Sequence, residues 1–262
     1  MNLSLTGEKA KVCGSTDGIG KATALTMAER GAEITLVARN EKKLAAALAE
    51  LSAAHGQIHK IVYAEFNQPD ELKRKIENYL KQSGQDVQIL VNNSGGPHGG
   101  QLIDAVENEF RVAFERLLIC SQIMARAVVP GMKILYRGRI INIISMSVRQ
   151  VIPGLGVSNT IRGSVAQWAK TLALELGDHG ITVNNILPGY SATNRLQDLA
   201  ESKARAQGVS PADIQESWTV NTSLRRLEKP GEIASASAFL ASDAASYING
   251  YDLSVDGGRF GA

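Results

Sequence analysis

Ser158 and Arg162 are the side chains whose types and spacing point most directly to chemistry. They stand four residues apart in the run SNTIRGSVAQWAKTLALEL, so we expect them to share one face of a helix. A serine hydroxyl donates a hydrogen bond but is a poor acid. The arginine keeps its charge, because its pKa lies above about 12, and could stabilise an alkoxide or bind hydroxyl groups without shuttling a proton. Ser145, which ends the run GRIINIIS, adds another hydroxyl.

A glycine-rich turn links the first expected strand to the first expected helix. Gly14 permits a tight turn, Gly18 lets the backbone approach a diphosphate, and Gly20 allows the helix to pack closely on the strand. The free N–H groups at the start of the helix would face the phosphates. This placement predicts a dinucleotide site. We expect its contacts to come from Gly14, Ser15, Asp17, Gly18, Ile19 and Gly20.

Arg39 follows the second expected strand and bears on the choice of dinucleotide. An acidic residue there would bind the adenosine ribose hydroxyls, whereas arginine favours a 2′-phosphate, so we predict NADP, with NAD as the alternative. Asp17 argues the other way, because its carboxylate would repel a nearby phosphate. It could instead cap the helix that starts at Gly18.

The elements that must position these residues alternate between strand-like and helix-like segments. Several strand candidates are continuous apolar runs, which is typical of parallel strands buried on both faces. The repeated units predict an α/β fold: a single doubly wound Rossmann domain over residues 1–262, with a seven-stranded, mostly parallel sheet and helices on both faces. The strand candidates are residues 9–14, 33–38, 59–64, 87–92, 139–145, 181–187 and 251–255.

A long polar excursion interrupts this alternation at about residues 190–230. Two short helices are expected within it, near 195–206 and 211–217. Because it leaves the carboxyl end of a parallel strand, where substrates bind in such sheets, we interpret it as a substrate lid. A solvated connection between two elements is the alternative.

Composition narrows the class of protein. The chain of 262 residues is 44% hydrophobic with a net charge of +2, and no basic run suggests a nucleic-acid partner. No apolar run reaches the length that a membrane helix needs, and the amino-terminal segment lacks an apolar signal core. Cys13 and Cys120 lie in apolar stretches and are expected to be buried, reduced thiols, which fits a cytoplasmic protein. The histidines and cysteines lack metal-ligand spacing, so no structural metal is expected.

Several motifs in a consistent order resemble the short-chain dehydrogenase/reductase family over essentially the whole chain. They are the GxxxGxG spacing of the first turn, Asn92-Asn93-Ser94-Gly95, the frame from Ser145 to Leu176, Pro188-Gly189 with Thr193, and the run from Leu240 to Gly258. The nearest likeness is to 3-oxoacyl-acyl-carrier-protein reductases and to a divergent branch of look-alikes. The resemblance implies an NAD(P)-dependent oxidoreductase acting on a small carbonyl or alcohol, and a 3-oxoacyl thioester is one candidate.

The resemblance also implies roles for individual residues. Glu65 would contact adenine, and Arg162 would bind the nicotinamide ribose. Further cofactor contacts are implied for Asn92, Ser94, Gly95, Pro188, Gly189 and Thr193. The expected helix over 108–132 and the one after Ser158 resemble the pair through which relatives form dimers and tetramers, although an ordinary buried helix would show the same pattern. The family usually has threonine where Cys13 stands, so a hydroxyl that braces the turn is missing.

The chain departs from the family at the positions that move a proton. Ser145 matches the family's serine, but Ser158 stands where tyrosine is expected, Arg162 where lysine is, and Leu117 where asparagine is. Two loop residues could supply the proton instead. They are His98, whose unperturbed pKa suits the task, and Tyr190. A solvated histidine and a tyrosine that only packs over the cofactor are the alternatives.

Two functions remain open at this point. The favoured one is an NADP-dependent oxidoreductase with a non-standard proton donor. The other is a catalytically impaired dinucleotide-binding protein that acts as a sensor or scaffold. Preserved Ser145 and the expected lid favour the enzyme, whereas the missing tyrosine and lysine favour the sensor.

Overall fold

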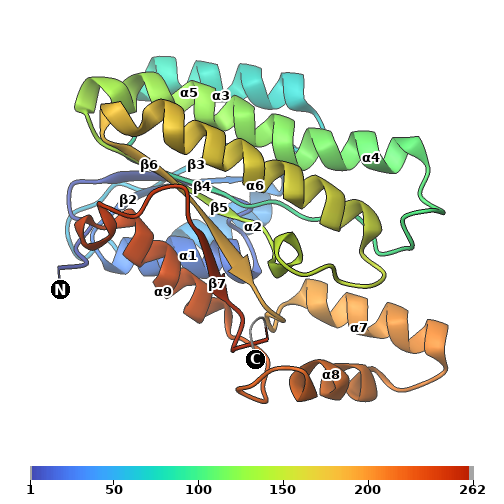
Figure 1. Ribbon diagram of the computed structural model, residues 1–262. Helices are drawn as coiled ribbons and strands as arrows, with labels where there is room; N and C mark the ends of the chain where they lie inside the picture. Colours follow the sequence, from blue (N-terminus) through green and yellow to red (C-terminus); the bar gives the residue numbers. More distant parts are fainter. Residues whose placement is uncertain (1, 260–262) are drawn as a thin grey trace.

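A single parallel sheet organises the protein, seen here in a computed structural model that describes residues 2–259. Its seven strands follow the order β3-β2-β1-β4-β5-β6-β7, and every neighbouring pair is parallel (Figure 1). The strands are β1 (Lys9–Cys13), β2 (Glu33–Ala38), β3 (Lys60–Tyr63), β4 (Ile89–Asn92), β5 (Gly138–Ile143), β6 (Ile181–Pro188) and β7 (Asp252–Val255). The seven predicted strands are confirmed, and the sheet is wholly rather than mostly parallel.

Helices cover both faces of the sheet, which confirms the doubly wound α/β fold (Figure 1). One face carries α1 (Gly18–Glu29), α2 (Glu41–Ala49) and α9 (Pro230–Ala241). The other carries α3 (Pro69–Ser83), α4 (Glu107–Phe114), α5 (Cys120–Leu135) and α6 (Gly156–Leu176). Each layer has its own apolar core, with Met27 and Ile34 fully buried on the first side and Ile76 and Met124 on the second. The strands between them are therefore buried on both faces, as their continuous apolar runs predict.

The predicted long helix over 108–132 is one continuous helical run with a defect in it. α4 passes through a π-helical turn, Glu115–Ile119, into α5. Leu117 lies in that turn, 5% exposed. Turns of this kind re-aim side chains and are often found near functional sites.

A chain of polar side chains crosses the interior of the sheet. Asn92, Asn142, Asn185 and Asp252 stand opposite one another on β4, β5, β6 and β7. Amide hydrogens are donated from Asn92 to Asn142 (2.9 Å), from Asn142 to Asn185 (3.0 Å) and from Asn185 to Asp252 (2.8 Å). Lys170 of α6 closes the chain with an ion pair to Asp252 at 2.7 Å. The strand register is thus fixed by directional bonds as well as by apolar packing.

The polar excursion folds as two helices beside the carboxyl ends of the strands. They are α7 (Asn194–Gln207) and α8 (Pro211–Val220), which confirms the expected pair and places it away from the helical layers (Figure 1). Trp218 and Ala200 are buried between them. Among residues 2–259, every helix is too short or too polar to traverse a lipid bilayer.

Candidate active site

Most of the predicted site residues gather at one edge of the sheet. Because the strands are all parallel, their carboxyl ends point to the same side, and the segments that follow β1, β2, β3, β4, β5 and β6 meet there. These segments supply Gly14, Arg39, Glu65, Ser94, Ser145 and Gly189 in that order. The candidates therefore come together because of topology, although they are far apart in sequence.

The first turn needs its glycines for conformation and for space. Gly14 and Gly18 have φ values of +59° and +50°, a region that favours glycine. A Cβ on Gly20 would lie 2.1 Å from the carbonyl oxygen of Gly14, so the helix could not approach the turn. Ser15 is fully buried beneath the turn, and Ile19 lines the adjoining cavity. The turn thus presents its backbone N–H groups at the start of α1, as a diphosphate site requires.

Asn93 braces this turn, a role that the sequence reasoning did not assign to it. Its amide donates to the carbonyl oxygens of Cys13 and Gly14, both at 3.3 Å. A Cβ on Gly14 would come within 2.7 Å of this amide. Asn93 thereby supplies a brace where the family's threonine hydroxyl is missing at Cys13.

Asp17 caps the first helix. Its carboxylate accepts from the N–H of Gly18 at 2.7 Å and from the side chain of Asn194, at the start of α7, at 2.8 Å. The capping interpretation of Asp17 is therefore supported, and the same residue ties the lid to the first turn.

The β4 loop sends its residues in two directions. Asn92 points into the sheet toward Asn142 and is absent from the residues that line the cavity at this edge. Ser94 lines the cavity, with its hydroxyl 3.5 Å from the carbonyl of Arg116. Gly95 faces open space, since a Cβ there would meet nothing within 4 Å. Of these three residues, Ser94 lines the cavity and Gly95 lies beside open space.

Ser145, Ser158 and Arg162 are brought together as their spacing predicts. The Nε of Arg162 donates to Ser158 Oγ at 3.2 Å, and its Nη1 donates to the carbonyl of Ile144 at 2.7 Å. Burial, with a smaller contribution from the charge of Arg195, lowers the pKa of Arg162 to about 10. Ser145 begins a short turn, Met146–Val148, with its hydroxyl accepting from Ser147 N–H at 3.1 Å. Two hydroxyls and a guanidinium, still charged at neutral pH, thus face one space.

That space is a cavity of about 200 Å³ between the strand ends and the lid. Ser145, Ser158, Arg162 and Tyr190 line it. His98 does not, and its side chain is exposed on the loop after Gly96. Further lining comes from Pro188, Gly189, Thr193, Arg195, Leu196, Leu199 and Arg259.

Tyr190 is held in a sandwich. Its ring stacks on Trp218 of α8 with centroids 4.9 Å apart, and the guanidinium of Arg259 lies 3.9 Å from its centroid on the ring face. Burial raises the pKa of Tyr190, although Arg259 opposes the shift. The phenol is consequently a weaker acid than a free tyrosine.

The comparisons with known proteins agree on the family. A family model described as enoyl-(acyl carrier protein) reductase matches residues 14–259. Glucose 1-dehydrogenase from Gluconobacter oxydans is 33% identical, over 96% of this chain and 91% of the relative. The 3-oxoacyl-[acyl-carrier-protein] reductase FabG from Vibrio cholerae is 32% identical, over 98% of this chain and 99% of the relative. The protein is a short-chain dehydrogenase/reductase.

A solved structure of the same fold carries a dinucleotide. L-sorbose reductase from Gluconobacter frateurii, complexed with NADPH and L-sorbose, superposes with a TM-score of 0.93 at 28% identity, and the match covers 100% of both chains. The likeness extends over the lid as well as the sheet. It covers all the elements that position the candidate site.

Leu117, which stands where the family resemblance leads us to expect asparagine, makes an apolar contact in this short-chain dehydrogenase/reductase. Leu117 packs with Ile144, Ile161 and Val165 in a small apolar cluster beside the cavity. Leu117 offers no polar group to this side of the site.

Glu228 is a further residue that the sequence reasoning missed. Its carboxylate accepts from Ser191 Oγ at 2.6 Å and from the N–H of Gly189 at 3.0 Å, and its backbone pairs with Tyr190 and Ala192. Burial raises its pKa to about 7, although these two hydrogen bonds favour the ionised form. Gly189 directly precedes the segment 190–230, and Glu228 lies near its end. The Glu228 side chain therefore links the two ends of that segment.

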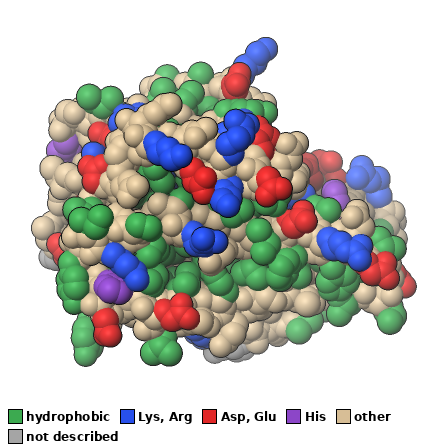
Figure 2. Space-filling view, turned by 90° about the horizontal axis from the view of Figure 1, so that it is seen from above, with side chains coloured by type: hydrophobic (Ala, Val, Ile, Leu, Met, Phe, Trp, Pro, Cys, Tyr) green, Lys and Arg blue, Asp and Glu red, His purple; other side chains and the backbone are tan. Residues whose placement is uncertain are grey.

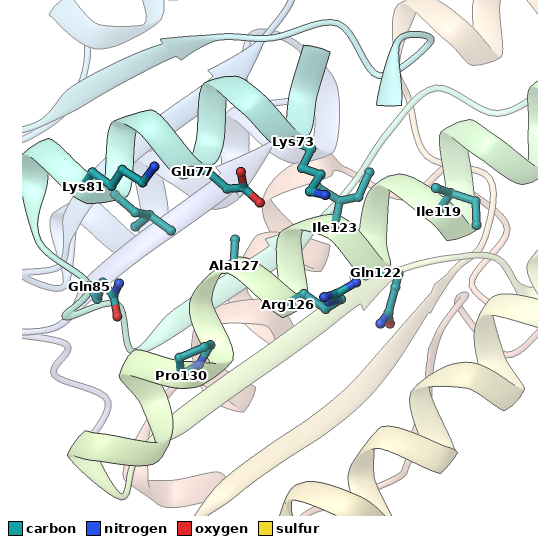
Figure 3. A pocket seen from close by; sticks show the side chains of 11 residues that line it. Lys73, Glu77, Lys81, Gln85, Ile119, Gln122, Ile123, Arg126, Ala127 and Pro130 are labelled. Atoms are coloured by element: carbon teal, nitrogen blue, oxygen red, sulfur yellow. The ribbon is translucent and has the colours of Figure 1, made fainter. Parts of the chain in front are cut away.

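A larger cavity, of about 500 Å³, lies elsewhere. It is a groove between α3 and α5, where Lys73, Glu77 and Lys81 face Ile123 and Arg126 (Figure 3). None of the predicted site residues lines it. Cavity volume alone would therefore have selected this groove rather than the cavity lined by Ser145, Ser158 and Arg162.

Proposed function

We propose that this protein is an NADP-dependent oxidoreductase that interconverts a carbonyl and an alcohol at the cavity beside Ser145. The observation that carries the proposal is the joint placement of an anion-binding turn, Arg39 and two cavity hydroxyls along one sheet edge. A dinucleotide fits the residues present: Gly95 leaves an open cradle, and the amides at Gly18 begin a helix of twelve residues. The NADPH complex of the similar sorbose reductase supports the same cofactor.

Arg39 supports NADP over NAD. Its side chain is 71% exposed at the end of β2, where a 2′-phosphate can reach it. Asp17, which argued for NAD, is engaged as a helix cap. NAD stays the alternative cofactor.

The chain's own residues would polarise the carbonyl and shield it. When bound, NADPH supplies a hydride to the carbonyl carbon, and the resulting alkoxide takes up a proton, giving NADP⁺ and an alcohol. The hydroxyls of Ser145 and Ser158 can donate to that oxygen, and Arg162, 3.2 Å from Ser158, stabilises its negative charge. The lid helices α7 and α8 limit the access of water.

The proton donor differs from the family's tyrosine. Ser158 is a poor acid, and its hydroxyl falls short of a tyrosine hydroxyl by roughly 4 Å, which leaves room for a water molecule. Tyr190 lies in the cavity lining but is a weakened acid, and His98 would have to swing in from solvent. We therefore propose that a water in the cavity delivers the proton, with Tyr190 and His98 as the side-chain alternatives.

A sensor or scaffold is the second candidate function. Leu117, Ser158 and Arg162 occupy three of the four positions that the resemblance assigns to the family's catalytic set, and none of them matches the expected residue. The cofactor site would be unchanged in either case. Turnover decides between the two.

The deciding experiment measures cofactor binding and turnover on the same preparation. We expect NADPH to bind and to be oxidised with at least one member of a panel of 3-oxoacyl thioesters, diketones, quinones and small oxo acids. Ser145→Ala should lower turnover by about 100-fold, the typical effect of removing one oxyanion donor. Ser164→Ala, on the exposed side of α6, is the matched control. Binding without turnover would favour the sensor, and no binding of either coenzyme would overturn both.

We further propose a homodimer or tetramer built through the outer face of α4 and α6. Figure 2 looks onto the helical layer that contains α6 and shows apolar side chains among the charged ones. Leu174 of α6 is 86% exposed, and Phe114 of α4 is 40% exposed. Leu174→Asp should reduce the mass measured by light scattering, whereas Ile58→Asp, at another exposed apolar position, should not. A monomer at every concentration would contradict this assembly.

A further inference from the structure

The cavity beside Ser145 carries an unusual excess of positive charge. Arg162, Arg195 and Arg259 line it, and its described lining contains no aspartate, glutamate, lysine or histidine. In the described part of the chain, no ion pair engages any of these three arginines. Clustered guanidinium groups without counter-charges repel one another, and a bound anion would relieve that repulsion.

Arg259 gives the most direct sign of an absent partner. Its Nη1 is buried and has no hydrogen-bond acceptor among the described residues. The rest of its guanidinium is fixed over the ring of Tyr190, which is itself held by Trp218. A buried donor left unpaired costs free energy, so a ligand that supplies an acceptor here is stabilised. Arg259 is thus pre-positioned rather than free to move to another partner.

Arg162 of α6 and Arg195 of α7 both reach Gly96. A Cβ placed on Gly96 would lie 3.0 Å from Nη2 of Arg162 and 2.9 Å from Nη2 of Arg195. Arg195 reaches there from α7 and donates to the carbonyls of Gly96 and Pro97 at 3.1 and 2.9 Å. Burial, then the charge of Arg116, lowers the pKa of Arg195, with Asp198 in part opposing them. Carbonyl oxygens are neutral acceptors, and the charge of Asp198 offsets that of Arg195 only in part.

The proposed cofactor brings no negative charge to these arginines, although its nicotinamide ribose is expected to lie against Arg162. Its diphosphate belongs at the start of α1 beside Gly18, and its 2′-phosphate belongs at Arg39. Arg162 lies instead against Ser158, at the end of the cavity where the carbonyl would be reduced. Arg259 lies against the ring of Tyr190, the residue that directly follows Gly189. The cavity arginines therefore face the substrate.

We infer that the substrate is a small carboxylate, an oxo acid or hydroxy acid, whose carboxylate is bound by Arg259 and the Arg162–Arg195 pair. This inference rests on the proposed oxidoreductase function. The reacting oxygen would lie against Ser145 and Ser158 while the carboxylate accepts from the guanidinium groups. A cavity of about 200 Å³ suits a compact acid rather than a long chain. Bidentate pairing with arginine is the geometry that carboxylates prefer.

The test compares the affinity of the protein–NADP⁺ complex for small acids with its affinity for the corresponding uncharged amides. Acetoacetate and 2-oxobutyrate are titrated by calorimetry beside acetoacetamide and 2-oxobutyramide, which match them in shape but lack the charge. We expect each acid to bind at least tenfold more tightly than its amide. Arg259→Gln should remove most of that preference and leave NADPH affinity within about twofold. Arg205→Gln, an exposed arginine of α7 outside the cavity, should change neither.

The outcomes separate this inference from the proposed function. If NADP⁺ binds and the amides bind as tightly as the acids, the carboxylate inference is overturned while the oxidoreductase stands. Unchanged acid preference in Arg259→Gln would equally overturn the role of Arg259. If neither coenzyme binds, the proposed function itself fails, and an acid preference retained by the coenzyme-free protein would then mark the cavity as an anion site of another kind.

Discussion

Arg39 and Glu65 form an ion pair across the carboxyl ends of β2 and β3, with Nη1 of Arg39 3.7 Å from Oε2 of Glu65. Sequence reasoning assigned them to different parts of the cofactor, the 2′-phosphate and the adenine. Glu65 also accepts from the N–H of Asn67 at 3.1 Å, so it is the more fixed of the two. Exposed pairs contribute little to stability, and Arg39 can exchange this partner for a phosphate at small cost.

The first prediction follows from that exchange. Arg39→Gln should weaken NADPH binding by about tenfold or more, because a charge-assisted hydrogen bond to the phosphate is lost, and should leave NADH binding nearly unchanged. Fluorescence titration of both coenzymes measures the effect. Lys42→Gln, which removes an exposed cation of α2, is the control. Equal affinities for NADPH and NADH in the unaltered protein would contradict the assignment.

A second prediction concerns the missing acid. Ser158 is 6% exposed and opens onto the cavity, so a tyrosine there can extend into space that the serine leaves empty. Ser158→Tyr combined with Arg162→Lys should raise kcat/KM for carbonyl reduction at least tenfold, since general acid catalysis typically contributes more than that. NADPH oxidation by the double variant is compared with that of Arg162→Lys alone, which lacks the acid. No gain in the double variant would show that proton transfer does not limit the reaction.

The sheet and the cofactor edge could be predicted because both depend on local patterns. Apolar runs define the seven strands, and the spacing of Gly14, Gly18 and Gly20 marks the first turn. The order of parallel units then brings the strand ends together. The contact between Ser158 and Arg162 could also be predicted, because residues four positions apart on a helix lie on the same face.

Contacts set by tertiary paths could not be read in this way. Asn92 belongs to a motif at a strand end, yet its direction depends on the register that places it opposite Asn142. Glu228 reaches the site because the end of the lid segment returns to the residues that follow β6. Arg259 reaches it because the segment after β7 lies against Tyr190. No hydrophobic periodicity in the sequence predicts either contact. In the sequence, the only sign of these contacts is a charged residue in each segment: Glu228 near the end of the lid segment and Arg259 after the last strand.

The third prediction addresses the polar chain inside the sheet. Asn142→Leu removes both bonds of the central amide. It leaves the Nδ2 of Asn92 without an acceptor and the Oδ1 of Asn185 without a donor, while Asn185 keeps its bond to Asp252. We expect the free energy of unfolding to fall by about 3 kcal/mol, because unpaired buried polar groups are costly. Urea denaturation gives the value. Asn108→Leu on the exposed face of α4 should change it by less than about 0.5 kcal/mol. Similar losses in both variants would argue against a structural role for the chain.

The final prediction uses the raised pKa of Glu228. With a pKa of about 7 in the folded protein against 4.5 for an ordinary carboxyl, the folded state holds the proton more tightly than the unfolded state between these values. The contribution of this group to stability is therefore fully present below about pH 4.5 and is lost as the pH rises through 7, by about 3 kcal/mol in total. Above pH 7 the carboxylate is charged in both states and the contribution no longer changes.

Glu228→Gln isolates this effect, because glutamine does not titrate. The difference in unfolding free energy between the unaltered protein and the variant should shift in favour of the variant as the pH rises from 5 to 8. Glu216→Gln, at an exposed position of α8, should show no such shift. The same titration should change NADPH affinity, since Glu228 holds Gly189 and Ser191 next to the cavity. Ionised Glu228 accepts both hydrogen bonds fully. NADPH affinity should therefore rise between pH 6 and 8 in the unaltered protein and stay flat in Glu228→Gln. A parallel rise in both proteins would assign the pH dependence to another group.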